Sequence, residues 1–539
     1  MRHLLICLCV LLILLTVSWP LQAKATTKAG TSDDFDSVEA VIFLLQEKGV
    51  IDEQEAQEFI RRHRTDGLPT GVTTPQKVYL EKVKDEVAEE VSEDVRKDVK
   101  KEILRSLAQR TSAFSSNWAN RIRWGGDVRL RYQADLFDEN NIENLQDPQS
   151  PEDPTELINT TEDRHRGRIR ARLGIKAQVN NQVEAGVRIV TGNEDNPVST
   201  NDNLGNFESK GVALDRVYLK WEPYPDNPFT DFVVWGGRIP NPFFSTGLVW
   251  DSDLNFEGAA VQYQTNLTPR WDAFINSGVF SIQEVEQFQD DKWLYAGQAG
   301  LEYSIEDPFR DIDTFRVKFG VAYYDYQELK GVVNDDVLFI GEDPTNDPVN
   351  VQFIQKGNTL IVTDLNSDGF ASEVGLASDY RLVNLTGELD IGVFDPYHIV
   401  LVADYVKNIG FDAQDVSRGL FSRFGVVDVH DWPEETEGYA LSLAVGIPKV
   451  RVFGDWKASL TYRRLERDAV LDSFTDSDFH LGGTNSEGWM LKGEFGLLQN
   501  VWLTARWISA DEINEDYQPF SLTGPLAVDT FQLDINALY

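Results

Sequence analysis

Residues 164–175 read RHRGRIRARLGI, and this stretch places an arginine at every second position. The arginines occupy positions 164, 166, 168, 170 and 172, and the residues between them from 167 onward are small or apolar. A period of two is the signature of a β-strand, because successive side chains point to opposite faces of a sheet. A helix would scatter the arginines around its axis. The stretch therefore predicts a strand with one face in water and the other against apolar surroundings.

The same alternation returns along the C-terminal part of the chain, from about residue 117 to residue 539. It predicts an all-β transmembrane fold, a closed antiparallel β-barrel of sixteen strands around a wet lumen, with eighteen strands as the alternative. The predicted strand segments are 126–137, 164–179, 183–191, 214–221, 232–239, 256–264, 271–280, 293–304, 314–326, 380–394, 397–406, 439–447, 455–463, 488–497, 501–509 and 530–539.

The predicted connections alternate between short turns and long, acidic loops. Asn180-Asn181 and Asp395-Pro396 are short turns, whereas residues 138–163 hold nine carboxylates and no Lys or Arg. Short turns on one rim and long loops on the other are typical of outer-membrane barrels. The acidic loops could gather cations or divalent ions at the mouth, or they could form a charged surface without a specific partner.

The last predicted strand fits a closed barrel in lipid. Lipid offers no partners for backbone N–H and C=O groups, so a membrane-spanning sheet must close without an edge. Phe531, Leu533, Ile535 and Tyr539 share one face of this segment, and polar residues occupy the other. The alternative is a secreted β-sandwich, but its dry core would not hold the long charged side chains of the polar faces. The C-terminal Tyr539 resembles the aromatic signal that the barrel-assembly machinery reads.

The N-terminal part of the chain predicts export and a helical region. Residues 1–25 have the form of a secretory signal peptide, and both cysteines lie in it, so the mature chain has no disulfide. Residues 26–70 predict a small helical unit. Residues 71–116 predict a charged periplasmic helix, either a coiled coil or a solvated spacer, before the barrel at 117–539. The net charge of −38 argues against binding to nucleic acid.

Assigning the polar parity of each strand to the lumen gives a wall rich in basic groups. The predicted pore-lining residues are Arg129, Arg131, Arg166, Arg168, Arg170, Arg172, Arg188, Arg216, Lys220 and Arg238. The connection after the fifth strand, residues 241–253, is aromatic and only mildly charged. We expect this loop to fold inward as a constriction, with the alternative that it only fills a gap beneath the rim. The candidate constriction residues are Phe243, Phe244, Asp251 and Asp253, whose carboxylates would oppose the arginines and sort solutes by charge.

Other chemistry finds little support in the sequence. Asp364, Asn366 and Asp368 begin a pattern like that of a calcium loop, but Gly375 stands where such a loop has its bidentate glutamate. The segment is a weak calcium candidate, and an Asx-rich turn is the alternative. The histidines lack metal-ligand spacing, and the chain has no Gly-x-Ser-x-Gly elbow. We therefore expect no enzyme activity and no cofactor.

Several motifs resemble those of the outer-membrane porins of Gram-negative bacteria. They are GGDVRLRY (125–132), RHRGRIRARLG (164–174), LDRVYLKW (214–221), GGRIPNPF (236–243), LVWDSDLNFEGAA (248–260) and, in the helical unit, LLQEKGVIDEQEA (44–56). These motifs cover the helical unit and the first third of the barrel. The resemblance implies a β-barrel channel, often trimeric, that passes small hydrophilic solutes passively, and it leaves the solute open.

Two functions fit the sequence. The first is an outer-membrane diffusion channel for small hydrophilic solutes or ions, with selectivity set by the width of the lumen and by the arginines of its wall. The second is a structural outer-membrane anchor that links the envelope through the periplasmic helix, with peptidoglycan as a candidate partner. Residues 74–110 would span on the order of 55 Å as a helix, at about 1.5 Å per residue.

Overall fold

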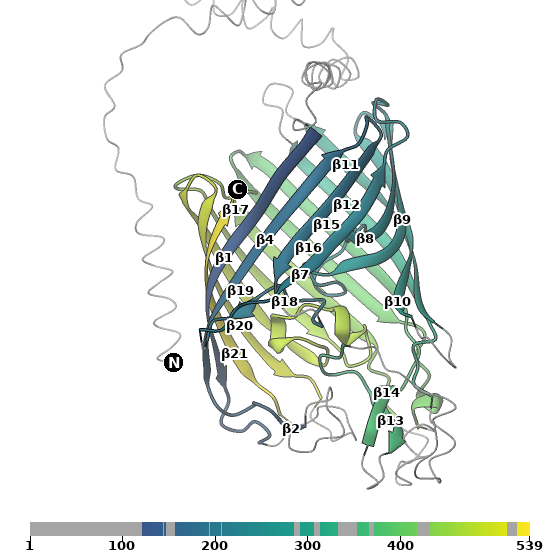
Figure 1. Ribbon diagram of the computed structural model, residues 1–539, viewed down its shortest axis with the longest axis vertical. Coiled ribbons are helices and arrows are strands. Elements are labelled where there is room, and N and C mark those ends of the chain that lie inside the picture. The colour runs from purple at the N-terminus through teal and green to yellow at the C-terminus, as the bar shows by residue number, and fades with distance from the viewer. Residues whose placement is uncertain are drawn as a thin grey trace, which may run out of the picture. The chain divides into compact units, whose positions relative to one another are not determined.

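The computed structural model folds the C-terminal part of the chain into one closed barrel (Figure 1). It describes residues 121–143, 145–146, 157–192, 195–205, 207–284, 291–306, 313–332, 353–365, 371–417, 432–514 and 525–539. The predicted signal peptide, helical unit and charged helix, residues 1–116, lie outside the described residues. The main sheet has 17 strands, and all except the two-residue β6 form the wall of the barrel, which leaves a 16-stranded wall.

The 16 wall strands follow one another around the barrel as antiparallel neighbours. They are β1 (Ile122–Phe137), β4 (Arg164–Gln178), β5 (Val183–Thr191), β7 (Val212–Trp221), β8 (Thr230–Pro240), β9 (Asn255–Thr268), β10 (Trp271–Gln283), β11 (Lys292–Glu306), β12 (Asp313–Gln327), β15 (Arg381–Phe394), β16 (Tyr397–Asn408), β17 (Glu437–Gly446), β18 (Trp456–Leu465), β19 (Ser486–Leu498), β20 (Val501–Glu512) and β21 (Val528–Leu538). Each overlaps one predicted segment, so the prediction of a 16-stranded antiparallel barrel is confirmed.

The first and last strands close the barrel. β1 pairs with β4 on one side and with β21 on the other, where Leu130 lies opposite Ile535. The backbone amide of Gly126 donates to the carbonyl of Tyr539 at 3.0 Å, and the Tyr539 amide donates back to Gly126 at 3.1 Å. A Cβ atom at Gly126 would lie 2.1 Å from the carbonyl oxygen of Arg172 on β4 and 2.7 Å from the hydroxyl of Tyr539, so the close approach of β1 to its neighbours needs glycine. Backbone pairing thus continues from strand to strand around the wall, as lipid requires.

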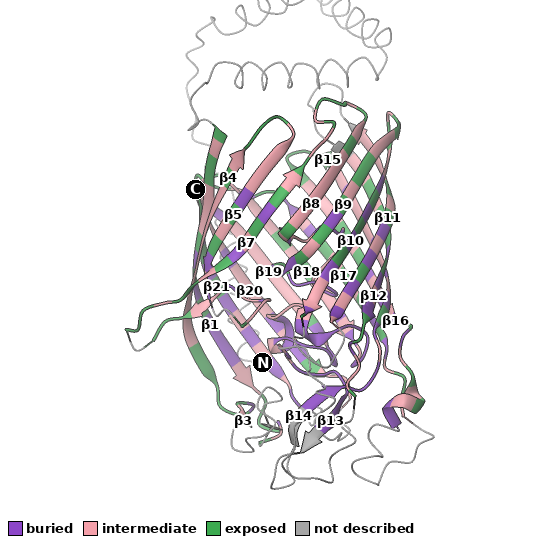
Figure 2. Ribbon diagram, turned by 45° about the vertical axis from the view of Figure 1, so that its right-hand side comes forward, coloured by how far each residue is buried: buried purple, intermediate pink, exposed green. Residues whose placement is uncertain are grey.

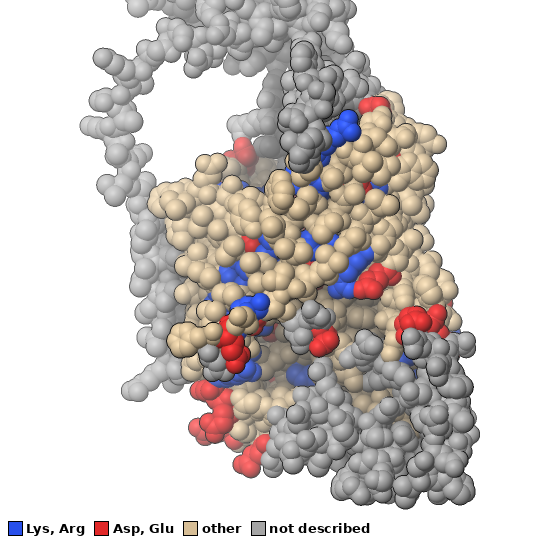
Figure 3. All heavy atoms as spheres, viewed as in Figure 1, with Lys and Arg blue, Asp and Glu red and all other residues tan. Residues whose placement is uncertain are grey.

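The two faces of the wall differ as the alternation predicts. On β1, Leu130 and Tyr132 are 52% and 46% exposed, whereas Arg129 and Arg131 are buried inside the barrel. Figure 2 shows buried residues gathered on the loops inside the barrel. Figure 3 shows that acidic and basic side chains occupy a minor part of the outer wall on the face in view. An apolar outer face suits the hydrocarbon of a membrane, and the lumen takes the charged groups.

Short turns join the strands at one rim of the barrel, and long loops join them at the other. The turns β4–β5, β15–β16 and β19–β20 lie at the short-turn rim, where β1 begins and β21 ends (Figure 1). We call the opposite rim the long-loop rim. Its loops carry the short strands β2 (Leu145–Gln146), β3 (Leu157–Ile158), β6 (Asp202–Asn203), β13 (Leu360–Leu365) and β14 (Ala371–Leu376). These small strands lie outside the predicted segments, because two to six residues are too few to show alternation.

Helical structure within the described ranges is short. Residues 413–417 form one helical turn, and two single-turn 3-10 helices, η2 (Asp472–Phe474) and η3 (Phe479–Leu481), lie between β18 and β19. Among the helices of the described residues, none has the length and apolar character needed to cross a membrane.

Candidate functional site

The loop between β8 and β9, residues 241–254, folds into the lumen, and we call it inner loop 1. The hydroxyl of Thr246 donates to the carboxylate of Asp404 on β16 at 2.5 Å, although β16 is adjacent to neither β8 nor β9. The side chain of Gln298 on β11 forms two hydrogen bonds with the backbone of Phe244. Its oxygen accepts from the Phe244 amide at 2.8 Å, and its NH2 group donates to the Phe244 carbonyl at 2.7 Å. Trp250 is 3% exposed. These contacts place inner loop 1 inside the barrel and not above its rim.

Aromatic packing fixes inner loop 1 to one side of the wall. The ring of Phe243 lies edge-on to Phe256, Phe280 and Tyr324, at centroid distances of 5.8, 6.1 and 5.3 Å. The ring of Trp250 lies edge-on to Phe256 at 4.9 Å and to Tyr324 at 5.2 Å. The three wall residues belong to β9, β10 and β12 and are buried. Because apolar burial and edge-to-face pairing both stabilise this cluster, we expect the loop to hold one position.

Arginines on β1, β4, β5 and β7 form what we call the basic wall. Its members are Arg129, Arg131, Arg166, Arg168, Arg170, Arg172, Arg188 and Arg216. Asp253 of inner loop 1 reaches this wall, and its carboxylate lies 3.1 Å from the guanidinium of Arg172 and 3.8 Å from that of Arg170. Asp127 on β1 accepts from Arg172 at 2.7 Å and from Arg170 at 2.8 Å. The structure thus brings one predicted loop carboxylate together with two predicted wall arginines.

The other predicted basic residues differ in how their charge is balanced. Arg166 pairs with Asp135 at 2.5 Å. Arg168 donates to the amide oxygen of Gln133 at 3.1 Å, and no described carboxylate lies within 4.0 Å of it. The remaining contacts are Arg129 with Asn201 and, at 4.0 Å, with Asp534, Arg188 with Asp215, Arg216 with Asn255 and Lys220 with Glu222. Arg168 and Arg216 are therefore lumen cations without a described carboxylate within 4.0 Å.

Arg238 lies on the opposite face from the one predicted. It stands opposite Val217 on β7 and Glu257 on β9, and Val217 is 42% exposed on the outer face. Arg238 therefore points outward, where it forms an ion pair with Glu257. The apolar Trp235 and Ile239 take the lumen-facing parity of β8. The prediction of a pore-lining Arg238 is wrong because this strand packs apolar side chains inward, against the inner loop.

A second loop, residues 466–485 between β18 and β19, also folds inward, and we call it inner loop 2. The Asp478 carboxylate of this loop accepts from three wall strands, from Arg131 on β1 at 3.0 Å, Arg506 on β20 at 2.8 Å and Gln532 on β21 at 3.0 Å. The sequence prediction does not include this loop. Its signal is apolar residues interspersed with aspartates, the same make-up that marks inner loop 1.

The two inner loops meet in the lumen. The amide of Asp251 donates to the carbonyl of Phe474 at 2.7 Å, and the amide of Ser477 donates to the Asp251 carboxylate at 2.8 Å. Contacts therefore run from the wall at β9–β12, through both loops, to the wall at β1, β20 and β21. Asp251 faces inner loop 2 in this arrangement, whereas Asp253 faces the basic wall.

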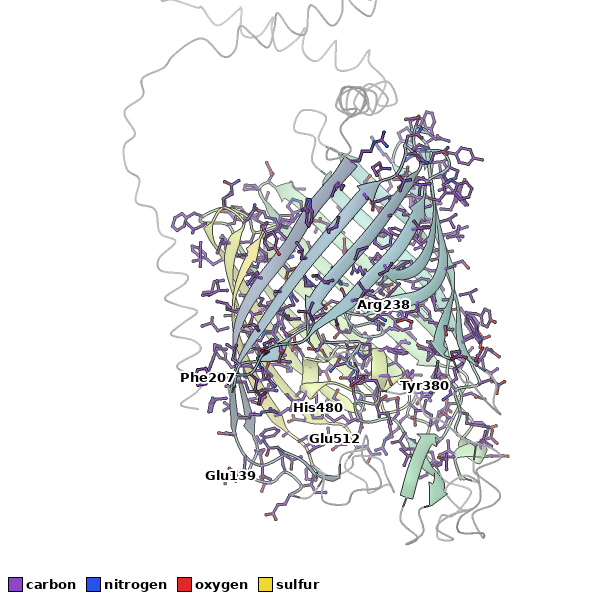
Figure 4. All side chains as sticks on the ribbon, viewed as in Figure 1. Glu139, Phe207, Arg238, Tyr380, His480 and Glu512 are labelled. Carbon is purple, nitrogen blue, oxygen red and sulfur yellow. The ribbon has the colours of Figure 1, made fainter. Side chains whose placement is uncertain are left out.

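Residues 353–359, from the connection between β12 and β15, pack against inner loop 2. The ammonium of Lys356 donates to Nδ1 of His480 at 2.9 Å and to the carbonyls of His480 and Gly482, each at 2.5 Å. Nε2 of His480 lies 2.8 Å from the carbonyl of Leu526 and donates to it, which leaves Nδ1 as an acceptor. Burial lowers the pKa of His480 well below its usual value, and the Lys356 charge lowers it further. A neutral His480, inside the barrel in Figure 4, thus joins inner loop 2 to the β12–β15 connection through Lys356 and to the β20–β21 connection through Leu526.

The carboxylates of the inner loops carry opposite pKa shifts. Burial by itself would raise the pKa of Asp478, but the neighbouring guanidiniums, above all Arg131 and Arg506, hold it well below its usual range. Burial raises the pKa of Asp251 well above its usual value, and the charge of Asp476 raises it further. Asp478 is therefore a fixed anion of the lumen, whereas Asp251 takes up a proton at a higher pH than an ordinary carboxyl group does.

The described residues contain no group of three or more His, Cys, Asp or Glu placed to hold a metal ion. Of the calcium candidate, Asn366 and Asp368 lie outside the described residues and Asp364 lies in β13, so that site stays a prediction. His398 faces the lumen and lies 2.6 Å from the carboxylate of Asp390 on the neighbouring strand. This pair belongs to the polar lining, together with Arg316 and Glu388.

The fold and the lumen together define a class of protein. A closed 16-stranded barrel with an apolar outer face, a charged lumen and loops folded into that lumen is an outer-membrane channel of the porin type. The family model described as "Putative porin" matches residues 36–539 of the chain. The chain therefore belongs to this porin family, and it forms a channel for passive diffusion across the outer membrane.

Solved structures of outer-membrane proteins are also similar to the chain. The outer membrane channel DcaP of Acinetobacter baumannii is 12% identical, with a TM-score of 0.37, over 78% of this chain and 97% of that chain. OprB of Pseudomonas putida, in a high-pH structure, is 10% identical, with a TM-score of 0.41, over 78% and 94%. OmpF of Salmonella typhi, in complex with daunomycin, is 11% identical, with a TM-score of 0.37, over 78% and 97%. No curated protein matches the chain in sequence.

Proposed function

We propose that this porin sorts small hydrophilic solutes and ions in the space between the two inner loops and the basic wall. The contact of 3.1 Å between Asp253 and Arg172 carries the proposal, because it sets an inner-loop carboxylate against the wall arginines. Asp478 adds a second inner-loop anion on the side of β1, β20 and β21. Opposed acidic and basic groups across a narrow opening create a transverse field, which favours solutes that carry or can orient charge.

We further infer that the channel prefers anions. Asp127, Asp135 and Asp215 each pair with at least one arginine of the basic wall, whereas Arg168 and Arg216 contact only uncharged side chains among the described residues. A guanidinium stays protonated at any physiological pH, and its field reaches solutes several ångströms away in the lumen. The excess positive potential is therefore expected along β4 and β7, near Arg168 and Arg216.

The expectations about partners and the N-terminal region remain proposals. We propose a homotrimer, recognition of Tyr539 by the barrel-assembly machinery, and a periplasmic location for residues 1–116. The start of β1 at the short-turn rim supports that location, since the short turns of such barrels are the periplasmic ones. An anchoring role, through binding of the 71–116 helix to peptidoglycan, would add to the channel function and not replace it.

Recording from purified mature chain in planar bilayers tests the proposal. We expect stepwise currents in potassium chloride, and a reversal potential in a salt gradient that indicates a preference for chloride. Lys449→Gln removes a positive charge from the turn between β17 and β18, outside the basic wall, and should leave the reversal potential unchanged. It is the matched control for the neutralisation of Arg168. A membrane-inserted barrel without current steps would contradict a conducting channel, and a preference for potassium would contradict the role given to the basic wall.

A further inference from the structure

A cavity of about 680 Å³ lies in the lumen between inner loop 1 and the turn that joins β7 to β8. Its lining includes residues of the β7–β8 turn, so it lies on the short-turn side of inner loop 1. The volume falls within the range of small-molecule sites, which combine apolar surfaces with a few placed polar groups. The lining residues that matter for the argument are Lys220, Phe244, Gln264, Phe274, Asn276 and Lys318.

We propose that this cavity is a binding site for an uncharged polyhydroxylated ring, such as that of a saccharide, on its way through the channel. The proposal rests on the channel function and adds a class of solute to it. Three features of the cavity support it: a fixed aromatic surface, lysines and carboxylates that balance in number, and polar groups that keep unused hydrogen-bonding capacity.

The aromatic surface consists of the rings of Phe244 and Phe274. Their centroids lie 6.3 Å apart with the ring planes at 89°. Gln298 fixes Phe244 through its backbone, and a Cβ atom on Gly300 would lie 2.2 Å from the Phe274 ring, so the missing side chain gives that ring its place. Two rings held in this way offer an apolar surface to the C–H face of a sugar without an added ordering cost.

The lysines of the cavity already have counter-ions. The ammonium of Lys318 lies 3.4 Å from the carboxylate of Glu302, and it sits 4.9 and 4.7 Å from the ring centroids of Phe244 and Phe274. The ammonium of Lys220 pairs with Glu222. Asp231 also lines the cavity, so the lining holds two lysines and two acidic residues and its charges balance. An anionic solute would have to compete with the carboxylates, and a cationic solute would have to compete with the ammonium groups. The cavity therefore favours an uncharged solute over either ion.

Several polar groups of the cavity can accept or donate further hydrogen bonds. The NH2 group of Asn276 donates to the side-chain oxygen of Gln298 at 2.9 Å. This bond does not use the side-chain oxygen of Asn276. Gln264 has no side-chain hydrogen bond to any described residue. An ammonium has three donors and a carboxylate has about four acceptor sites, so the ion pairs can add hydroxyl partners without breaking. Hydroxyl groups, which both donate and accept, match this mixed set.

Current block by sugar in planar bilayers tests the proposal. Maltotriose, added on the side of the short-turn rim, is expected to reduce the single-channel current in a saturable way. Sodium benzoate and choline chloride, at the concentration of maltotriose that halves the current, are expected to have little effect. Phe244→Leu should raise the half-blocking concentration about tenfold, a change of about 1.4 kcal/mol, because leucine keeps the burial but not the flat ring.

Two further variants show whether a change in maltotriose block comes from the cavity itself or from a disturbance of inner loop 1 or of the barrel. Gln264→Leu, on β9 and outside inner loop 1, should weaken the block in the same direction. Phe453 is 76% exposed in the turn between β17 and β18. Phe453→Leu is therefore the matched control, and maltotriose should block this variant as it blocks the wild type. Normal steps in potassium chloride with no maltotriose block, or equal block in all variants, would overturn the proposal. A stronger block by benzoate would overturn the choice of an uncharged solute. Absence of any current step would instead contradict the channel function.

Discussion

The guanidinium of Arg131 and the carboxylate of Asp478 lie 3.0 Å apart, although 347 residues separate them in the chain. Arg131 belongs to the first wall strand, and Asp478 belongs to inner loop 2. Arg131 also forms a paired contact with Asp534 on β21, at 2.7 and 3.0 Å, and its side chain has no exposed surface. One buried arginine therefore joins the seam of the barrel to the loop that crosses its lumen.

Replacing Asp478 by asparagine is expected to release inner loop 2 from the wall. The substitution leaves Arg131 and Arg506 close together with one counter-charge fewer, and removal of one partner from a buried pair typically costs about 3–5 kcal/mol. We expect a larger and noisier single-channel conductance in planar bilayers. Asp226→Asn, at an exposed aspartate in the β7–β8 turn, is the matched control and should leave the conductance unchanged. An unaltered conductance in Asp478→Asn would show that inner loop 2 does not narrow the path.

Sequence alternation predicts the barrel well because lipid outside and water inside impose a period of two on every wall strand. It also predicts which face of β4 carries the arginines, since Ile169 and its apolar neighbours must take the other. The alternation fails at Arg238, where apolar residues pack inward against inner loop 1 and the charged residue turns outward. A lumen that contains packed loops is not uniformly polar, so polarity alone does not mark its lining.

The position of inner loop 2 is beyond any local pattern. Its place depends on contacts between Asp478 and strands at both ends of the chain, and on the backbone bond between Asp251 and Phe474. Such contacts depend on how the closed barrel brings distant segments together. Composition indicates only that a loop with apolar residues seeks burial, which is how inner loop 1 was recognisable.

The contact between the inner loops is expected to weaken as the pH rises. Burial raises the pKa of Asp251 well above its usual value of 3.8, and the charge of Asp476 adds to this. A carboxyl group whose pKa is raised in the folded state stabilises that state fully at low pH, and the contribution is lost as the pH rises through the raised pKa. At a pH between the usual pKa and the raised pKa, Asp251 holds a proton in the folded state but not in the unfolded state.

Asp476→Asn tests this pH dependence. The Oδ1 atom of Asp476 accepts from the amides of Asp478 and Phe479 at 2.8 and 3.2 Å, and asparagine can keep both bonds while removing the charge. We expect the variant to gain unfolding free energy at pH values above the raised pKa of Asp251, where the Asp251 carboxylate is charged, and to gain little at lower pH, where Asp251 is protonated. Urea unfolding in detergent at a series of pH values measures this. An equal gain at every pH would exclude Asp251 as the titrating group.

Neutralising Arg168 should change ion selectivity more than neutralising Arg170. Arg170 is balanced by Asp127 at 2.8 Å, whereas Arg168 contacts only the uncharged Gln133. A unit charge about 8 Å from the path in a water-like medium contributes about 0.5 kcal/mol for each ion, with opposite sign for chloride and potassium, so their permeability ratio should change roughly fivefold. Reversal potentials of Arg168→Gln and Arg170→Gln in a potassium chloride gradient measure the two effects. Equal shifts would mean that ion pairing within the wall does not decide which charges the ions meet.

Leu441 and Ser442 are neighbours on β17 with opposite orientations, so they offer a direct test of which face meets lipid. Leu441 is 56% exposed on the outer face, and Ser442 faces the lumen, where it accepts a hydrogen bond from Thr461 at 2.9 Å. Arginine on the lipid face near the bilayer midplane costs about 2–4 kcal/mol, so Leu441→Arg should lower the unfolding free energy in lipid vesicles by about that amount. Leu441→Ala removes the side chain without adding charge and should cost at least 1–2 kcal/mol less than the arginine variant. Ser442→Arg should cost less than about 1 kcal/mol, because its charge remains in water. A larger loss in Ser442→Arg than in Leu441→Arg would mean that the wet and lipid-facing sides of the wall are reversed.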